Sequence, residues 1–248
     1  MSNMLYQQND IIPVWDKLAG SYDSNIYWGK PENYANLQVL LDQIGNPVDK
    51  SIIEVGCGGG LVSVALAKKG AHCTLLDISN QSLKAAINSF IDEGLPEPVS
   101  YLADALDSNI HSETFDVVWN AGVIEHFFDK GKERLVSEMM RITKPGGKVV
   151  ILVPNSWCLV FQIIQRWQKW NKTWPYGYED DMSPWRLKML AKTLGINNFR
   201  VFAFNPILGW TWLNKVRKII KLFGFDTIKN HSKRSLFGFM SVMVIEKS

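Results

Sequence analysis

The chain has 248 residues, of which 46% are hydrophobic and 21% charged, the ordinary balance of a soluble globular protein. This composition excludes intrinsic disorder, collagen-like repeats and small disulfide-stapled scaffolds. A formal net charge of +3 is too small to indicate nucleic-acid binding by itself. The three cysteines form no C-x-x-C pair, which favours a reducing compartment. With no signal-peptide pattern and no apolar run of membrane-spanning length, we expect a cytoplasmic protein.

Short apolar runs alternate with amphipathic segments between residues 51 and about 153, which is typical of strands connected by helices. Helices are predicted over residues 60–70, from a Ser79 cap to about Phe90, and over 131–143. The predicted strands are SIIEV (51–55), AHCTLLDI (71–78), VSYLADA (99–105), FDVVWNAG (115–122) and KVVILVP (148–154). This order predicts right-handed crossovers and a mostly parallel sheet that is covered on both faces.

The regular alternation of predicted strands and helices ends after Pro154. Residues 156–185 are rich in Trp, Tyr and Gln, residues 184–195 predict a helix, and 199–204 and 237–246 predict two terminal strands. The intervening residues 205–236 are too many for a hairpin loop. We therefore predict an N-terminal helical cap at 1–50 and one α/β domain at 51–248, with substrate-lid segments at about 156–195 and 205–236.

A glycine-rich turn follows the first predicted strand, in the stretch Glu54-Val55-Gly56-Cys57-Gly58-Gly59-Gly60. Such a turn lies at the carboxyl ends of the strands and lets the backbone pass close to a ligand. The dinucleotide fingerprint G-x-G-x-x-G is not met, because Leu61 stands where the third glycine should fall.

Two acidic residues end the next strands. Asp77 ends the second strand, where its carboxylate can accept both hydroxyls of a ribose, and Asp104 ends the third, within reach of an adenine edge. A structural role as a helix-capping aspartate remains open for Asp77, and a structural role is equally open for Asp104.

The segments EVGCGGG, LLDIS, LADA, FDVVWNAGVIEHF and KPGGKVVILVPN together resemble a class I S-adenosylmethionine-dependent methyltransferase. The resemblance covers about residues 50–154 and implies a Rossmann-like, seven-stranded sheet whose last strand is antiparallel. It also implies contacts with S-adenosylmethionine. The residues expected to contact the cofactor are Glu54, Gly56, Cys57 and Gly58 at its methionine part, Asp77 and Ile78 at its ribose, Asp104 and Ala105 at its adenine, and Asn120 and Ala121 over the centre of the cofactor. Tyr22 of the N-terminal segment is a further candidate contact.

His126, in the stretch Ile124-Glu125-His126-Phe127, follows the fourth strand at the ligand edge of the sheet. An imidazole there can act as a general base, or it can order the loop or contact the cofactor. The stretch resembles the ubiquinone-type O-methyltransferases, which bind a divalent metal through this Glu-His pair and a Glu three residues earlier. Gly122 stands at that position, so we expect no metal, and the quinone-type acceptor loses support.

The acceptor pocket is expected from the segments outside the core. Large aromatic side chains there suit an apolar or aromatic acceptor, although they can equally pack a small core of their own: Trp157, Trp167, Trp170, Trp174, Tyr176 and Tyr178. Glu179-Asp180-Asp181 can pair with an amine, and a solvated turn is the favoured reading. Residues 210–223 form a basic amphipathic stretch that can contact a membrane surface, support a homodimer or lid, or pack on the chain itself.

We therefore predict a methyltransferase that acts on an O or N atom of a small, aromatic or apolar molecule and not on nucleic acid. The alternatives are a nicotinamide-dependent oxidoreductase on a related fold and a non-catalytic cofactor-binding subunit. Against the oxidoreductase stand Leu61 and the absence of any Tyr-x-x-x-Lys pair. Against nucleic acid stand the lack of an Asn-Pro-Pro-Tyr motif and of a concentrated basic surface.

Overall fold

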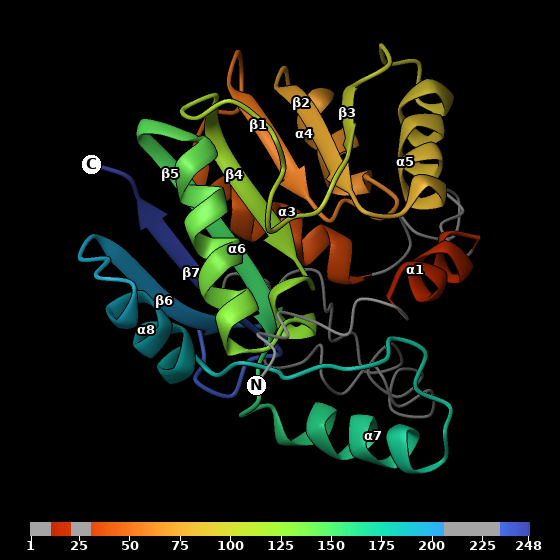
Figure 1. Ribbon diagram of the computed structural model, residues 1–248, viewed down its shortest axis with the longest axis vertical. Coiled ribbons are helices and arrows are strands. Elements are labelled where there is room, and N and C mark those ends of the chain that lie inside the picture. The colour runs from red at the N-terminus through yellow and green to blue at the C-terminus, as the bar shows by residue number, and fades with distance from the viewer. Residues whose placement is uncertain (1–10, 21–30, 206–233) are drawn as a thin grey trace, which may run out of the picture.

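The computed structural model describes residues 11–20, 31–205 and 234–248. Its centre is a seven-stranded sheet in the order β3-β2-β1-β4-β5-β7-β6 (Figure 1). The strands are β1 (Ser51–Val55), β2 (His72–Asp77), β3 (Val99–Leu102), β4 (Phe115–Ala121), β5 (Thr143–Pro154), β6 (Phe199–Phe204) and β7 (Met240–Glu246). The first five pair in parallel, and β7 is antiparallel to both β5 and β6. The predicted fold class is confirmed.

Helices cover both faces of the sheet. One face packs against α6 (Asp129–Ile142) and α8 (Pro184–Thr193), which contribute Leu135, Met139 and Leu187 to a core with Ile53 and Val118. The other face packs against α3 (Pro31–Ile44), α4 (Leu61–Ala67) and α5 (Asn80–Asp92). Sequential parallel strands with crossovers require this sandwich, because both faces of the sheet are apolar.

Two further helices lie at the carboxyl ends of the parallel strands. The short α1 (Ile11–Ala19) contacts α5, and the hydroxyl of Ser79 donates a hydrogen bond of 2.6 Å to Asp16 of α1. Helix α7 (Leu159–Trp170) follows β5 and lies beyond the carboxyl ends of the strands (Figure 1). None of the helices within the described ranges is long and apolar enough to cross a membrane.

Local capping explains where several helices begin. The hydroxyl of Ser79 accepts a hydrogen bond from the N–H of Ser82 at 3.0 Å, which confirms the predicted cap of α5. Ser183 caps α8 in the same way, and Pro184 occupies the first turn, where its missing N–H costs nothing.

The structure corrects some predicted boundaries. Strand β5 begins at Thr143 and not at residue 148, so the chain passes from α6 into the strand without a separate turn. Strand β3 ends at Leu102 and not at residue 105. Helix α7 stands in a stretch for which the sequence predicted no element. The basic stretch 210–223 lies outside the described residues.

Candidate functional site

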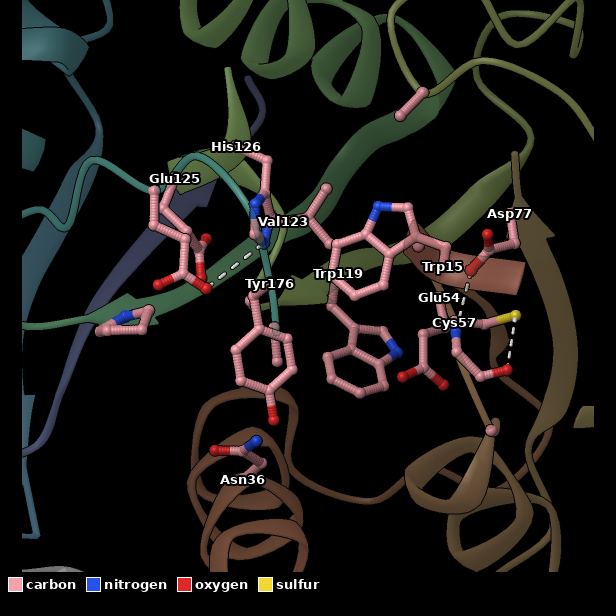
Figure 2. Close-up of a pocket in the computed structure, with 18 of the residues that line it drawn as sticks. Trp15, Asn36, Glu54, Cys57, Asp77, Trp119, Val123, Glu125, His126 and Tyr176 are labelled. Carbon is pink, nitrogen blue, oxygen red and sulfur yellow. Dashed lines mark hydrogen bonds and ion pairs between the residues drawn. The ribbon is translucent and has the colours of Figure 1, made fainter. Parts of the chain in front are cut away.

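One pocket lies at the carboxyl ends of the strands around the point between β1 and β4 where the strand order reverses. Ligands of open α/β sheets bind at this point. The cavity has a volume of about 300 Å³. Its lining includes ten of the predicted site residues: Glu54, Gly56, Cys57, Gly58, Asp77, Ile78, Asp104, Ala105, Ala121 and His126. Asp77 and Cys57 lie at one end and Glu125 and His126 at the other, with Trp15 and Trp119 between them (Figure 2).

The glycine-rich turn between β1 and α4 forms one wall. Gly56, Gly58 and Gly60 have φ angles of 70°, 51° and 65°, in the left-handed region that other residues rarely adopt. The N–H of Gly56 donates to the carbonyl of Leu76 at 2.7 Å, which ties the turn to β2. The glycines therefore let a backbone this sharply bent stand directly against the cavity.

The carboxylate of Asp77 joins two loops at this end of the pocket. One oxygen accepts a hydrogen bond from the N–H of Gly58 and the other from the N–H of Ser79, both at 2.9 Å. Burial raises the pKa of Asp77 although these two bonds oppose the shift. Glu54 accepts a bond from the Ser63 hydroxyl, and its burial raises its pKa to about 8. The cofactor end is thus acidic and largely dry.

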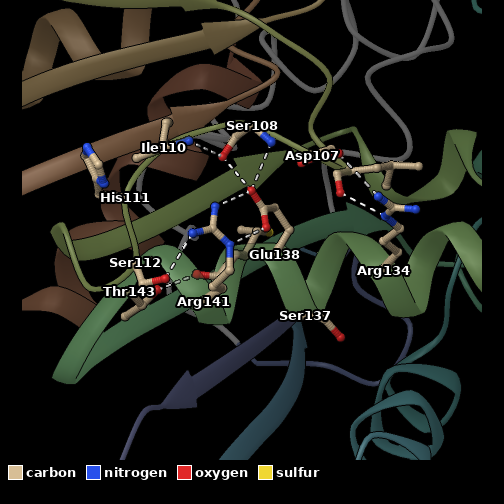
Figure 3. A network of polar contacts seen from close by, with 12 residues as sticks. Asp107, Ser108, Ile110, His111, Ser112, Arg134, Ser137, Glu138, Arg141 and Thr143 are labelled. Carbon is tan, nitrogen blue, oxygen red and sulfur yellow. Dashed lines mark hydrogen bonds and ion pairs between the residues drawn. The ribbon is translucent and has the colours of Figure 1, made fainter.

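Asp104 and Ala105 are held by the loop between β3 and β4, which a polar network fastens to α6 (Figure 3). Glu138 of α6 accepts hydrogen bonds from the backbone and hydroxyl of Ser108 and from Arg141. Burial alone would raise the pKa of Glu138, but Arg141 and Ser108 lower it to about 2. This loop is therefore anchored by a carboxylate that stays ionised at neutral pH.

Two predicted cofactor contacts are not placed in the pocket. Asn120 is fully buried on the opposite face of β4, where its amide nitrogen lies 3.4 Å from the sulfur of Met139. The neighbouring Trp119 and Ala121 line the cavity instead, because side chains alternate along a strand. The prediction for the Asn120 side chain is therefore not supported by its position. Tyr22 lies outside the described residues.

His126 ends a short 3₁₀ turn, η1 (Ile124–His126), and is buried. Its Nδ1 lies 2.8 Å from the carbonyl oxygen of Tyr178, an acceptor, so Nδ1 carries the hydrogen. Its Nε2 lies 3.8 Å from an oxygen of Glu179, and the ring packs edge-on against Trp15 at 5.0 Å. Burial lowers the pKa of His126 to about 4, so the imidazole is neutral at physiological pH.

The segment between α7 and α8 supplies the other wall, with Trp174, Tyr176 and Glu179. The structure places fewer aromatic residues in this wall than the sequence predicts. Trp157, Trp167, Trp170 and Tyr178 are not in the lining, and Trp170 is 79% exposed on the outer side of α7. The acceptor surface therefore depends on fewer aromatic side chains than predicted.

The acidic triplet is not a solvated turn, and that prediction is wrong. The side chain of Glu179 is only 6% exposed, and burial together with the neighbouring Asp181 raises its pKa to about 8. Asp180 forms ion pairs with Lys132 and Arg186. Burial opposes ionisation of Asp180, but hydrogen bonds from Arg186 and Lys132 lower its pKa to about 2.

Glu179 is the site residue whose burial the sequence pattern indicates least well. Lys132 offered an indirect signal, because its spacing places it on the same helix face as Leu135, Val136 and Met139. The Lys132 side chain is 2% exposed, and a buried ammonium requires an acidic partner. That partner is Asp180, next to Glu179.

The sheet order, the antiparallel last strand and the glycine turn with its acidic neighbours are those expected of a class I S-adenosylmethionine-dependent methyltransferase. The family model described as "Methyltransferase domain" matches residues 53–151. Those residues form a methyltransferase domain, and the protein is an enzyme that uses S-adenosylmethionine as its cofactor.

Known proteins with similar sequences include several O-methyltransferases and an N-methyltransferase. The chain is 28% identical over 174 residues to a ubiquinone biosynthesis O-methyltransferase from Idiomarina loihiensis, covering 67% of this chain and 70% of that protein. It is 37% identical over 145 residues to a chloroplastic tocopherol O-methyltransferase from Arabidopsis thaliana. That match covers 58% of this chain but only 36% of the relative.

Among solved structures, an S-adenosylmethionine-dependent methyltransferase from Thermotoga maritima, titled a possible histamine N-methyltransferase, superposes with a TM-score of 0.66. The superposition covers 95% of this chain and 99% of that one at 17% identity, which establishes a common fold.

Proposed function

We propose that the protein transfers the methyl group of S-adenosylmethionine to an oxygen or nitrogen atom of a small apolar or aromatic molecule. The observation that carries this proposal is the pocket, whose glycine-turn end is continuous with an apolar and aromatic end that includes Phe161, Trp174 and Tyr176. The names of the relatives favour oxygen, since those with the largest aligned lengths are O-methyltransferases for ubiquinone biosynthesis and tocopherol.

The fit of the cofactor rests on the glycine turn, where a backbone without Cβ atoms borders a cavity large enough for a small ligand. In the proposed assignment, Glu54, Gly56, Cys57 and Gly58 bind the methionine part, Asp77 and Ile78 the ribose, and Asp104 and Ala105 the adenine. Ala121 lies over the centre. When bound, S-adenosylmethionine supplies an electrophilic methyl group on a sulfonium.

We propose His126 as the residue that accepts the proton of the attacking group. Its Nδ1 hydrogen is held by the Tyr178 carbonyl, so Nε2 presents its lone pair. The lowered pKa keeps the imidazole neutral at neutral pH, so Nε2 carries a lone pair and not a proton. The main contribution of the enzyme is to hold the acceptor near attack distance, since in-line transfer depends on positioning.

Several finer assignments belong to the same proposal. We assign α1 and the segment between α7 and α8 to the pocket's lid, because Ile11, Trp15, Trp174 and Tyr176 line the cavity. The free thiols of Cys57, Cys73 and Cys158 support a reducing, cytoplasmic location. A homodimer and a membrane-surface contact through 210–223 stay predictions, as does the exclusion of nucleic acid.

Calorimetry with S-adenosylmethionine tests the cofactor half of the proposal. We expect micromolar binding to the wild type and at least a hundredfold weaker binding to Asp77→Ala, because that carboxylate holds Gly58 and, in the proposal, the ribose. Asp92→Ala, an exposed change at the end of α5, is the matched control and should bind as the wild type does. A wild type that binds NADH in place of S-adenosylmethionine would sink the proposal.

Transfer of labelled methyl groups tests the acceptor half. We expect product from phenolic acceptors and a loss of at least tenfold in kcat with His126→Gln, without a matching loss of cofactor affinity. Cofactor binding without transfer to any phenolic or amine acceptor would instead favour a non-catalytic subunit.

A further inference from the structure

Three potential metal ligands meet at the acceptor end of the pocket. Glu125 and His126 come from η1, and Glu179 comes from the segment after α7. One ligand atom from each lies within 4.8 Å of the other two. Ligand bonds of about 2.1 Å allow donor atoms to stand up to about 4.2 Å apart, so a small rotation of one carboxylate suffices to close the site.

The ring of His126 is already oriented as a metal-binding histidine would be. Metal-bound histidines almost always donate their second ring N–H to a carbonyl or carboxylate. Here Nδ1 donates to the carbonyl of Tyr178, which leaves the lone pair of the ring on Nε2. Nε2 is also the atom that lies 3.8 Å from Glu179.

A buried carboxylate oxygen without a partner points to a missing cation. Glu125 is 1% exposed, and its Oε2 has no hydrogen-bond partner. Buried polar atoms are almost always paired, so this orphan needs an explanation. Glu179 has one oxygen held by the amide of Gln165 at 2.8 Å, while the other faces His126. Glu125 thus has one oxygen without a partner, beside an oxygen of Glu179 and Nε2 of His126 that face each other.

The chain holds Glu179 in this place through its neighbours. The N–H of Asp180 donates to the carbonyl of Glu125 at 2.9 Å, which joins the two segments backbone to backbone. The Asp180 side chain is fixed by Lys132 and Arg186. Since Tyr178 and His126 are 52 residues apart in sequence, only the tertiary structure reveals that the ligands converge.

We propose that Glu125, His126 and Glu179 bind one divalent cation of the Mn²⁺ type, with Glu179 in the role that the ubiquinone-type enzymes give to an acid at the position of Gly122. Oxygen donors suit Mg²⁺ and Mn²⁺, whereas an imidazole favours transition ions, and Mn²⁺ satisfies both. The expectation of no metal rested on Gly122 alone, and the fold supplies a third acid from elsewhere. This inference rests on the proposed function for its purpose: a cation here would polarise an acceptor hydroxyl as a Lewis acid. Nε2 of His126 can bind the cation or accept a proton but not both, so with the cation bound the hydroxyl proton would pass to solvent and His126 would act as a ligand.

The experiment titrates MnCl₂ into the full chain after removal of metals with EDTA, using calorimetry and the electron paramagnetic resonance signal of free Mn²⁺. We expect one ion per chain, a rise in Tm on binding, and at least tenfold weaker binding to Glu179→Gln. Glu97→Gln, an exposed change of the same kind, should bind as the wild type does. Glu125→Gln is the second variant and should lose affinity to a similar degree.

Wild-type binding weaker than millimolar would overturn the inference. So would Glu179→Gln and Glu125→Gln variants that bind Mn²⁺ as tightly as the wild type, since the ion would then be held elsewhere. Calorimetry with S-adenosylmethionine on the same samples separates the two proposals. Mn²⁺ binding without cofactor binding would leave the metal site and remove the proposed function, and the reverse result would remove only the metal site.

Discussion

The two ends of the pocket are built from different kinds of sequence. The cofactor end comes from consecutive strand–loop units, with Glu54, Gly56, Asp77 and Asp104 each at or just after a strand end. The acceptor end combines α1, η1 and the segment after α7, which are far apart in the chain. A site made by consecutive units can be read from spacing, whereas a site made by distant segments requires the fold.

The two ends are also stabilised differently. At the cofactor end, backbone N–H groups of Gly58 and Ser79 bond to Asp77, so the polar contacts are local to adjoining loops. At the acceptor end, a buried ammonium, Lys132, holds the segment of Glu179 through Asp180. The acceptor end should therefore depend more on single charged side chains, and variants can test this difference.

The largest expected effect is at the acceptor end. Asp180→Ala leaves the ammonium of Lys132 buried with only Asp129, at 3.7 Å, as a further described ion-pair partner. Breaking such a pair costs about 4 kcal/mol of unfolding free energy. Urea unfolding measures the loss, and adding Lys132→Met should restore part of it. A double variant no more stable than Asp180→Ala would contradict the role of the buried charge.

An intermediate effect is expected at the glycine turn. In Gly60→Ala the new Cβ would lie 2.8 Å from the Cβ of Ala86, and the φ of 65° is unfavourable for alanine. We expect a loss of about 3 kcal/mol from strain and overlap together. Gly45→Ala is the control, since its φ is 72° with no atom within 4 Å of the new Cβ, and it should lose only about 1 kcal/mol. Equal losses would show that crowding contributes nothing.

The smallest loss of stability is expected from Glu54→Gln, and its sign reverses as pH rises. With a pKa of about 8 in the folded state and 4.5 when exposed, Glu54 keeps a proton on folding that the unfolded chain has released. The free energy of unfolding therefore falls as pH rises from 4.5 to 8, by up to about 1.4 kcal/mol per pH unit for this group. Glu54→Gln should stay within about 1 kcal/mol of the wild type at pH 4, where both states carry the proton, and should become more stable than the wild type by about 2 kcal/mol at pH 6 and by more at pH 8. Parallel pH profiles of the two proteins would contradict the raised pKa.

Much of the fold could be predicted because the strands read as short apolar runs between turn signals, including β3, whose side chains are exposed at the edge of the sheet. The seven strands and the Ser79 cap follow from such local patterns. Helix α7 has no start signal in the sequence, because Cys158 stands at its N-cap without a capping hydrogen bond, and its exposed residues include Leu159, Ile163 and Trp170. Without a predicted helix, Trp157, Trp167 and Trp170 are expected in the acceptor pocket, which they do not line.

Within the site, the limits of prediction follow side-chain direction and distance along the chain. Asn120 belongs to a motif that borders the cavity, but strand alternation turns its side chain away. Glu179 sits in a run of three acids that looks solvated in sequence, and only the contacts of Asp180 bury it. Neither the direction of a side chain nor a distant partner is recorded in residue spacing.

The position of β7 has a consequence for how the chain folds while it is being synthesised. β7 follows every other described strand in the chain, yet it lies between β5 and β6 in the sheet. Until the ribosome releases the residues up to Glu246, β6 has no partner and one edge of β5 stays open. During that interval these strands expose unpaired N–H and C=O groups, the feature that promotes aggregation of nascent chains. The last strand to be made is therefore the one that closes the sheet.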